Sequence, residues 1–163
     1  MREVVKSNRL KYSFGTLGWI NFYGIPIFLI LGGLFFLFKD LKNNNVDTIS
    51  ISMTILGVLL YLVQERKLRF NRIKLNTPAN KFAKNVREVL QEDGWEIEYD
   101  NKNYIQAVNR TNLFSLDLLT IKYLKNEIRW NLVHHPESHN SIAALFSLNL
   151  KSKKTIKKII ASA

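Results

Sequence analysis

The fold of this chain is decided by residues 12–38, which read YSFGTLGWINFYGIPIFLILGGLFFLF and contain no Asp, Glu, Lys or Arg. A helix of about 20 apolar residues crosses the hydrocarbon core of a bilayer, which is about 30 Å thick. Residues 48–64, TISISMTILGVLLYLVQ, form a second uncharged run. The two runs predict transmembrane helices over about residues 20–38 and 48–64, joined as a hairpin.

Other interpretations of these runs fit the sequence less well. A cleaved signal peptide has a shorter apolar region that ends at a small-x-small site, whereas residues 35–38 are Phe-Phe-Leu-Phe. The second run is short enough to be a core helix of a soluble protein, which would leave a single span. Its flanks argue against that, because one is acidic and polar and the other is strongly basic.

Average composition conceals the two runs, because the mean hydropathy of the 163 residues is −0.08. The remainder of the chain is rich in Lys, Arg and Asn, and the net charge is +11. We assign residues 1–75 to the hairpin with its basic flanks, and residues 76–163 to one small domain. The chain contains no cysteine, which excludes a disulfide framework and a thiolate zinc site.

Charge asymmetry predicts the orientation of the hairpin. Nine basic residues flank the runs on their outer sides: Arg2, Lys6, Arg9, Lys11, Arg66, Lys67, Arg69, Arg72 and Lys74. The connection between the runs holds only Lys39 and Lys42. Lys and Arg are retained on the cytoplasmic side of a membrane. Both termini are therefore expected in the cytoplasm, with the turn at residues 43–45 outside.

The second run carries small and polar residues at spacings of four and three, which place them on one helical face. They are Ser50, Thr54, Gly57, Tyr61 and Gln64. Such a stripe in a membrane helix marks close helix–helix approach. It packs against the first span, or it faces a subunit interface or a water-filled pore. Neither span contains a charged residue, so a proton relay, voltage sensor or ion-coupled transporter is not expected.

The spacing of apolar residues changes in residues 76–163. Thr77 and Pro78 predict the N-cap and first position of a helix, whose apolar face continues to a break at Gly94. Alternating residues then predict four strands, over residues 95–99, 104–110, 116–124 and 127–135, in an antiparallel meander. Residues 142–150 are ambiguous, and residues 153–161 predict a closing helix. The expected class is thus an α+β membrane protein: two transmembrane helices, then a cytoplasmic helix, a four-stranded antiparallel sheet and a C-terminal helix.

Lysines crowd the C-terminal segment, at positions 151, 153, 154, 157 and 158. Lys153, Lys154, Lys157 and Lys158, with Arg66, Lys67 and Arg69 after the second span, form a candidate membrane-surface group. A basic residue near an anionic leaflet contributes about 1 kcal/mol. Direct nucleic-acid binding is not expected, because no aromatic side chains lie between the lysines to stack on bases. The remaining alternative is a closing helix with a solvated lysine face.

The sequence offers little catalytic or cofactor chemistry. Gly15 and Gly18 precede a membrane span and form no phosphate-binding loop. His134, His135 and His139 lie near Glu137, but Pro136 interrupts the helix that a metal site would need there. We therefore expect no metal site and no cofactor.

Arg129 and His134 form an Arg-x4-His pattern, which is the minimal motif of the HEPN ribonuclease family. In those enzymes the two side chains converge on an RNA phosphate. Here the segment alternates as a strand, and an odd separation places the two side chains on opposite faces of a sheet. No catalytic site is expected, and ribonuclease activity is not predicted.

The layout as a whole resembles the small membrane accessory proteins of type VI-B CRISPR loci. The resemblance rests on the length, the Lys/Asn-rich composition, the N-terminal spans, the compact cytoplasmic domain and the pattern of Arg129 and His134. It implies a homo-oligomeric, pore-like assembly in the bacterial inner membrane. That assembly would depolarise the membrane when a partner RNA-guided ribonuclease effector is active in antiviral defence.

The residues themselves leave a second function open. A membrane-anchored interaction module, such as an immunity or regulatory protein, would bind a partner through its cytoplasmic domain. In both functions the chain has the lipid bilayer as a binding partner.

Overall fold

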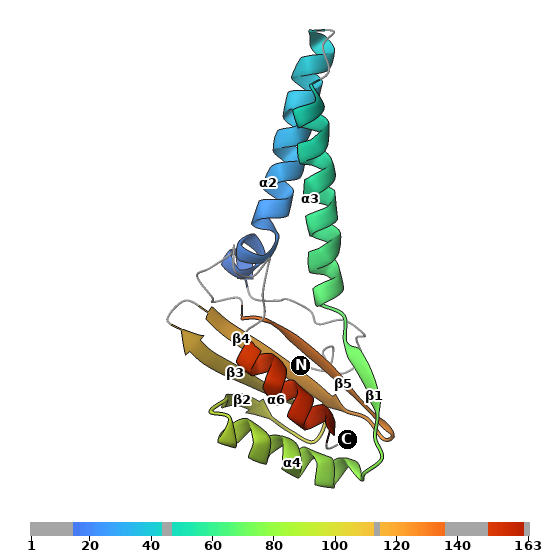
Figure 1. The fold of residues 1–163 in the computed structure, drawn as a ribbon, viewed down its shortest axis with the longest axis vertical. Coiled ribbons are helices and arrows are strands. Elements are labelled where there is room, and N and C mark those ends of the chain that lie inside the picture. The colour runs from blue at the N-terminus through green and yellow to red at the C-terminus, as the bar shows by residue number, and fades with distance from the viewer. Residues whose placement is uncertain (1–14, 44–46, 113–114, 136–149, 162–163) are drawn as a thin grey trace. The chain divides into compact units, whose positions relative to one another are not determined.

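The computed structural model describes residues 15–43, 47–112, 115–135 and 150–161. The chain divides into two compact units between Arg66 and Lys67. The described residues form four helices and a five-stranded antiparallel sheet. Figure 1 shows these elements with their labels. The predicted turn at residues 43–45 falls largely outside the described residues, as do the basic residues of the N-terminus.

The first unit is a pair of long helices, α2 (Gly15–Lys42) and α3 (Thr48–Lys67). Both are long and apolar enough, by length and composition, to cross a membrane. Most of their apolar surface is exposed: Phe38 retains 75% of its accessible surface and Ile49 retains 71%. Helices that bury so little are not core helices of a soluble fold, because exposed apolar patches of this extent mark contact with a partner or a membrane.

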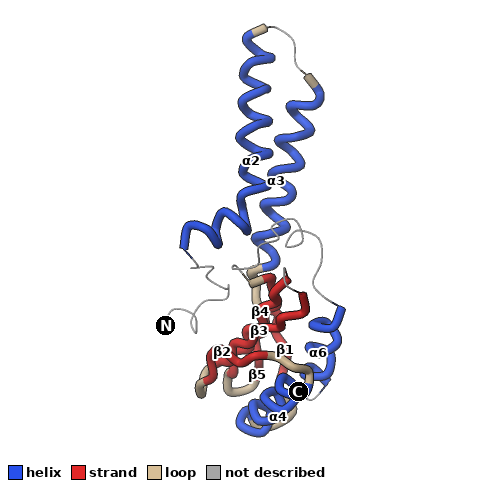
Figure 2. Tube along the Cα trace, turned by 90° about the vertical axis from the view of Figure 1, so that its left-hand side faces the viewer, coloured by secondary structure: helices blue, strands red, loops and turns tan. Residues whose placement is uncertain are grey.

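Pro26 lies inside α2 rather than at its start. Proline cannot donate the backbone hydrogen bond of its turn and clashes with the preceding one, so it kinks a helix. Figure 2 shows that the first turns of α2 run in a different direction from the rest of the helix.

The second unit is built on a sheet with the strand order β1-β5-β4-β3-β2. The strands are β1 (Asn71–Lys74), β2 (Glu96–Asp100), β3 (Tyr104–Asn112), β4 (Ser115–Tyr123) and β5 (Glu127–His134). The last four form the predicted antiparallel meander, because each pairs with the next. The alternation of apolar and polar residues was therefore a sound guide to these strands.

The predicted number of four strands is wrong, because β1 adds a fifth. The sequence assigned Asn71–Lys74 to the basic flank of the hairpin, but Ile73 lies opposite Ile128 and Lys74 opposite Glu127 on β5. A four-residue strand with one apolar side chain has no readable period. Its position is set by pairing with a strand more than 50 residues away in sequence.

Helices α4 (Ala79–Glu92) and α6 (Leu150–Ala161) pack on one face of this sheet. They bury Phe82, Val86 and Leu90 of α4 and Ile156 and Ile159 of α6 in one core with the strands. The spacing of these side chains, four residues in α4 and three in α6, is the amphipathic pattern that a core-facing helix needs. The strand residues of the same core are Ile105, Ala107, Leu119, Ile121, Tyr123, Ile128 and Leu132.

The end of α4 is fixed by Gly94, as predicted. Gly94 has φ +74°, a left-handed conformation that glycine adopts without a steric penalty. The backbone N–H groups of Gly94 and Trp95 donate to the carbonyls of Gln91 and Leu90. At the other end, the N-cap residue is Pro78 rather than Thr77, and it makes no side-chain capping hydrogen bond.

Candidate functional site

The small and polar stripe of α3 contacts α2. A Cβ atom added to Gly57 would lie 2.8 Å from the backbone nitrogen of Ile30 and 2.9 Å from the carbonyl oxygen of Pro26. A Cβ atom added to Gly33 would overlap the hydroxyl group of Thr54. Glycine on each helix therefore permits the two backbones to approach closely.

Polar side chains hold the same two helices together. The hydroxyl of Ser50 donates to Asp40 at 2.7 Å, and the hydroxyl of Tyr23 donates to Glu65 at 2.6 Å. The ring of Tyr61 lies 5.4 Å from that of Tyr23, centroid to centroid. Of the five residues of the predicted stripe, Ser50, Thr54, Gly57 and Tyr61 thus have their described contacts within the hairpin, and Gln64 is fully buried. These are the contacts that the packing interpretation requires, and a subunit or pore surface at this stripe remains a prediction.

Arg129 and His134 lie on β5 but do not come together. The guanidinium group of Arg129 contacts the carboxylate of Glu127, at 2.7 Å. His134 lies opposite Asp117 in the strand register, and its Nδ1 atom is 3.0 Å from the carboxylate of Asp117. Because they are five positions apart on a continuous strand, the two side chains belong to opposite faces of the sheet. Neither is placed to share a substrate phosphate with the other.

His134 instead belongs to a buried polar cluster between the sheet and α6. The hydroxyl of Ser152 donates to Asp117 at 2.6 Å and accepts from the amide of Asn109 at 3.2 Å. The side chains of the cluster are at most 6% exposed. The hydrogen bonds of Ser152 link α6 to β3 and β4.

The lysines of α6 share its outer face. Lys153, Lys154 and Lys157 are exposed, while Ile156 and Ile159 are buried against the sheet. Lys158 is partly engaged, because it donates to Asp93 at 2.6 Å. This hydrogen bond, together with one from Thr155, lowers the pKa of Asp93 below its usual value. The basic residues after the second span differ in exposure: Arg66 and Arg69 are exposed, whereas Lys67 is half-buried.

Lys122 on β4 is a buried cation that sequence inspection missed. Its side chain is 1% exposed, and its Nζ atom lies 4.0 Å from the centroid of the Phe70 ring. Burial, with a smaller effect from the positive charge of Arg129, lowers the pKa of Lys122 to about 8. Alternation marks a lysine in a strand as solvent-facing, so burial of both faces of β4 could not be predicted from the sequence.

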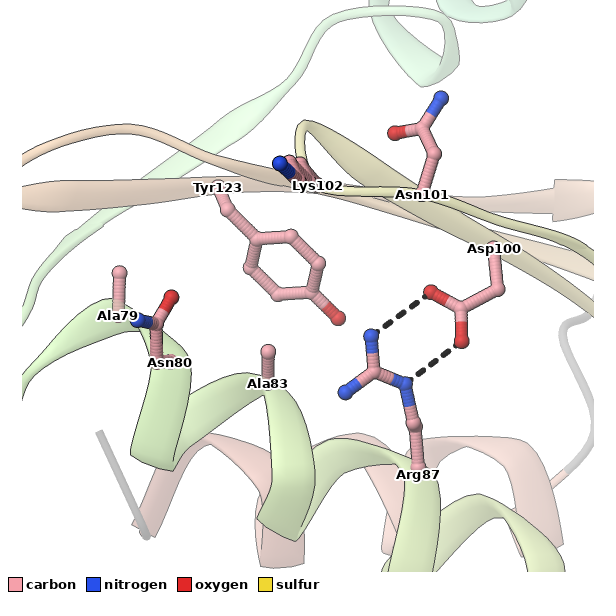
Figure 3. A pocket seen from close by; sticks show the side chains of 8 residues that line it. All are labelled: Ala79, Asn80, Ala83, Arg87, Asp100, Asn101, Lys102 and Tyr123. Carbon is pink, nitrogen blue, oxygen red and sulfur yellow. Dashed lines mark hydrogen bonds and ion pairs between the residues drawn. The ribbon is translucent and has the colours of Figure 1, made fainter.

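A pocket of about 640 Å³ opens between α4 and the sheet. Its lining includes Asn80, Ala83 and Arg87 from α4 and Asp100, Lys102 and Tyr123 from the strands and a turn. Figure 3 shows Arg87 reaching across to Asp100, with the hydroxyl of Tyr123 directed toward the same pair. No local sequence pattern connects these residues, because the sheet brings them together.

Arg87 and Tyr123 differ in whether their polar groups have hydrogen-bond partners. The guanidinium of Arg87 binds Asp100 through two hydrogen bonds, of 2.6 and 2.9 Å, which raise the pKa of Arg87. The hydroxyl of Tyr123 is buried and has no hydrogen-bond partner among the described residues. Burial raises the pKa of Tyr123, so its hydroxyl stays protonated and available as a donor.

Within the described part of the chain, no three His, Asp or Glu side chains gather as a metal site would require. His139 and Glu137 lie outside the described residues. No family model, curated protein or solved structure matches the chain. The site must therefore be interpreted from its own geometry.

Proposed function

We propose that this chain is a membrane-anchored interaction module, in which the α2–α3 hairpin holds a small α+β domain at the cytoplasmic membrane surface. The connection between the two units carries the proposal. Helix α3 ends at Lys67 and β1 begins at Asn71, so three residues join them. Three residues extend over about 10 Å at most, which keeps an anchored domain next to the bilayer.

The side chain of Asn131 strengthens this connection on the domain side. Its amide nitrogen donates to the carbonyls of Lys67 and Arg69, at 2.7 and 2.9 Å. Leu68 and Phe70 are buried. The carbonyl hydrogen bonds and the two buried side chains tie residues 67–70 to the sheet. The module is built for a short reach, which suits a partner at the membrane.

The outer face of α6 is the best candidate for the binding surface. It presents Lys153, Lys154 and Lys157 to solvent, whereas Ile156 and Ile159 of the same helix are buried in the core. Cations on a rigid helix attract anionic headgroups within a Debye length, about 8 Å at physiological salt. We assign this face to contact with the anionic leaflet.

Orientation can be tested with reporters. A periplasm-active reporter fused after Ala163 is expected to be inactive, and the same reporter inserted at Asn44 is expected to be active. The reason is the excess of Lys and Arg outside the two runs, which keeps those segments in the cytoplasm. The opposite activities would place the domain outside and remove every cytoplasmic partner from the proposal.

Contact of α6 with lipid can be tested on residues 67–163, which keep β1 in the sheet. Changing Lys153, Lys154 and Lys157 to Gln is expected to weaken binding to phosphatidylglycerol vesicles on the order of 100-fold, since each lysine contributes about 1 kcal/mol. Vesicle co-sedimentation at two salt concentrations measures the effect.

The matched control removes the same charge elsewhere. Lys81, Lys84 and Lys125 are also exposed, and changing them to Gln should leave most of the binding. If the unaltered domain fails to bind vesicles even at low salt, the leaflet assignment is wrong.

The pore-like assembly and the link to an RNA-guided effector remain predictions from the resemblance. The residues that the sequence offered for a pore surface make their described contacts inside the hairpin. For this reason the anchored module is the better-supported function. Size measurement of the full chain in mild detergent separates the two, because a ring and a monomer differ several-fold in mass.

A further inference from the structure

The pocket beside α4 has the features of an anion site in a part of the molecule that the anchoring function does not use. Ala79 and Asn80, the first two residues of α4, line it. The first N–H groups of a helix have no acceptor within the helix, and they carry a partial positive charge. Pro78 at the N-cap makes no side-chain hydrogen bond to them.

Side-chain charge in the pocket adds to this helix end. Lys102 is exposed at the pocket, and Asp100 is the only acid among the lining residues. The charge of Asp100 is balanced by Arg87 through two hydrogen bonds. The positive charges of Lys102 and of the helix end therefore remain uncompensated within the lining.

Tyr123 supplies an independent sign of a missing ligand. Its side chain is only 9% exposed, and its hydroxyl has no hydrogen-bond partner among the described residues. A buried hydroxyl without a partner costs free energy that a ligand acceptor would restore. In Figure 3 the hydroxyl points toward the Arg87–Asp100 pair.

The Arg87–Asp100 pair, toward which this hydroxyl points, is held together weakly. Its two side chains are 38% and 31% exposed, and ion pairs that are partly solvated contribute little to stability. An anionic ligand can therefore exchange for Asp100 as the partner of Arg87 and expose the hydroxyl of Tyr123 at small cost. Arginine is suited to this exchange, since its planar group binds carboxylate and phosphate alike.

We propose that this pocket binds the phosphate monoester group of a small molecule, with the phosphate held by Arg87, Lys102 and the hydroxyl of Tyr123. A flat apolar body would lie against Ala83 and the ring of Tyr123. The volume of about 640 Å³ accommodates a ligand of mononucleotide size. The proposal does not depend on the orientation of the hairpin.

Binding of adenosine 5′-monophosphate to the full chain in an uncharged detergent tests the proposal. Isothermal titration calorimetry should detect saturable binding of the nucleotide, weaker binding of inorganic phosphate and no binding of adenosine. Lys102→Gln and Tyr123→Phe should each weaken the nucleotide about tenfold, the typical effect of losing a hydrogen bond to a charged group. Tyr123→Phe keeps the ring in the core, and near-ultraviolet circular dichroism verifies the fold.

Lys84→Gln is the matched control. Lys84 lies on α4 with its side chain 76% exposed, outside the pocket lining, and its loss changes the net charge equally. Its affinity for the nucleotide should be unchanged. An equal loss in Lys84→Gln and Lys102→Gln would show non-specific attraction and overturn the site, and so would adenosine binding as tightly as its phosphate.

A lipid headgroup can carry the same group, because phosphatidic acid is also a phosphate monoester. Micelles doped with phosphatidic acid distinguish the two sources. If phosphatidic acid competes with the nucleotide, and Tyr123→Phe weakens that competition, the ligand is a lipid. If the nucleotide binds and phosphatidic acid does not compete with it, the ligand is soluble. Both results support the phosphate site. If neither ligand binds in a way that depends on Lys102 and Tyr123, the proposal is wrong.

Discussion

Replacing Gly57 by Leu is expected to separate α2 from α3 while leaving both helices able to insert. A Cβ atom at this position would already lie 2.8 Å from the backbone nitrogen of Ile30 and 2.9 Å from the carbonyl oxygen of Pro26. Backbone atoms cannot turn aside as a side chain does, so the helices must move apart. Lipid provides no hydrophobic gain to offset the lost contact.

The absence of cysteine from the chain provides a direct measurement. The Oγ atom of Ser50 and the Oδ2 atom of Asp40 are 2.7 Å apart. Cysteines introduced at these two positions should therefore form a disulfide readily when the hairpin is closed. Overpacking costs about 1–3 kcal/mol, and 1.4 kcal/mol is a tenfold change in an equilibrium. We therefore expect Gly57→Leu to slow oxidation about tenfold or more.

Val58→Leu is the control for this experiment. Val58 neighbours Gly57 in sequence but is 43% exposed, so a larger side chain there should leave oxidation unchanged. Rapid oxidation in Gly57→Leu would contradict close packing at this glycine. If oxidation stayed rapid while a high-order complex was lost, the stripe would be a subunit surface, as the pore interpretation requires.

Lys122→Met is expected to stabilise the domain at pH 7. The lysine is 1% exposed, and its pKa is lowered to about 8 mainly by burial. Lowering the pKa from 10.5 to about 8 corresponds to about 3 kcal/mol against the charged form. Methionine is unbranched and similar in length but carries no charge. The contact with Phe70 offsets part of the gain, so we expect a net gain of about 1–3 kcal/mol.

The pH dependence follows from the same lowered pKa. Between about pH 8 and 10.5 the unfolded chain holds a proton on Lys122 that the folded chain has released, so stability rises with pH across this window. Below pH 8 both states are protonated, and the full cost of the buried charge is present. Lys122→Met should lack this rise.

Thermal unfolding of the full chain in detergent, followed by tryptophan fluorescence at pH 7 and pH 10, measures both effects. The unfolding temperature should increase by roughly 4 °C or more at pH 7. The control is Lys125→Met, because Lys125 is exposed in the turn after β4 and its replacement should change stability by less than about 0.5 kcal/mol. A lower unfolding temperature for Lys122→Met would mean that the buried amine is held by interactions stronger than its desolvation cost.

The sequence by itself determined the elements whose signal lies in neighbouring residues. The uncharged runs indicated α2 and α3, the recurrence of Phe82, Val86 and Leu90 indicated α4, and Gly94 marked its end. Alternation located β2 to β5 within a few residues. Each of these signals is a local period or a local conformational preference, so no knowledge of distant contacts was needed.

Only the tertiary structure decided what depends on pairing across long sequence separations. β1 becomes a strand because Asn71–Lys74 meets β5, and Ser152 finds Asp117 across 35 positions. Lys122 is buried, although its place in an alternating strand marks it as solvent-facing. The pocket is likewise assembled from α4, β4 and a turn. The local sequence determines the preference of each segment for helix or strand. Which segments become neighbours in space depends on contacts between residues far apart in the sequence, because those contacts form only when the chain closes the loops between them.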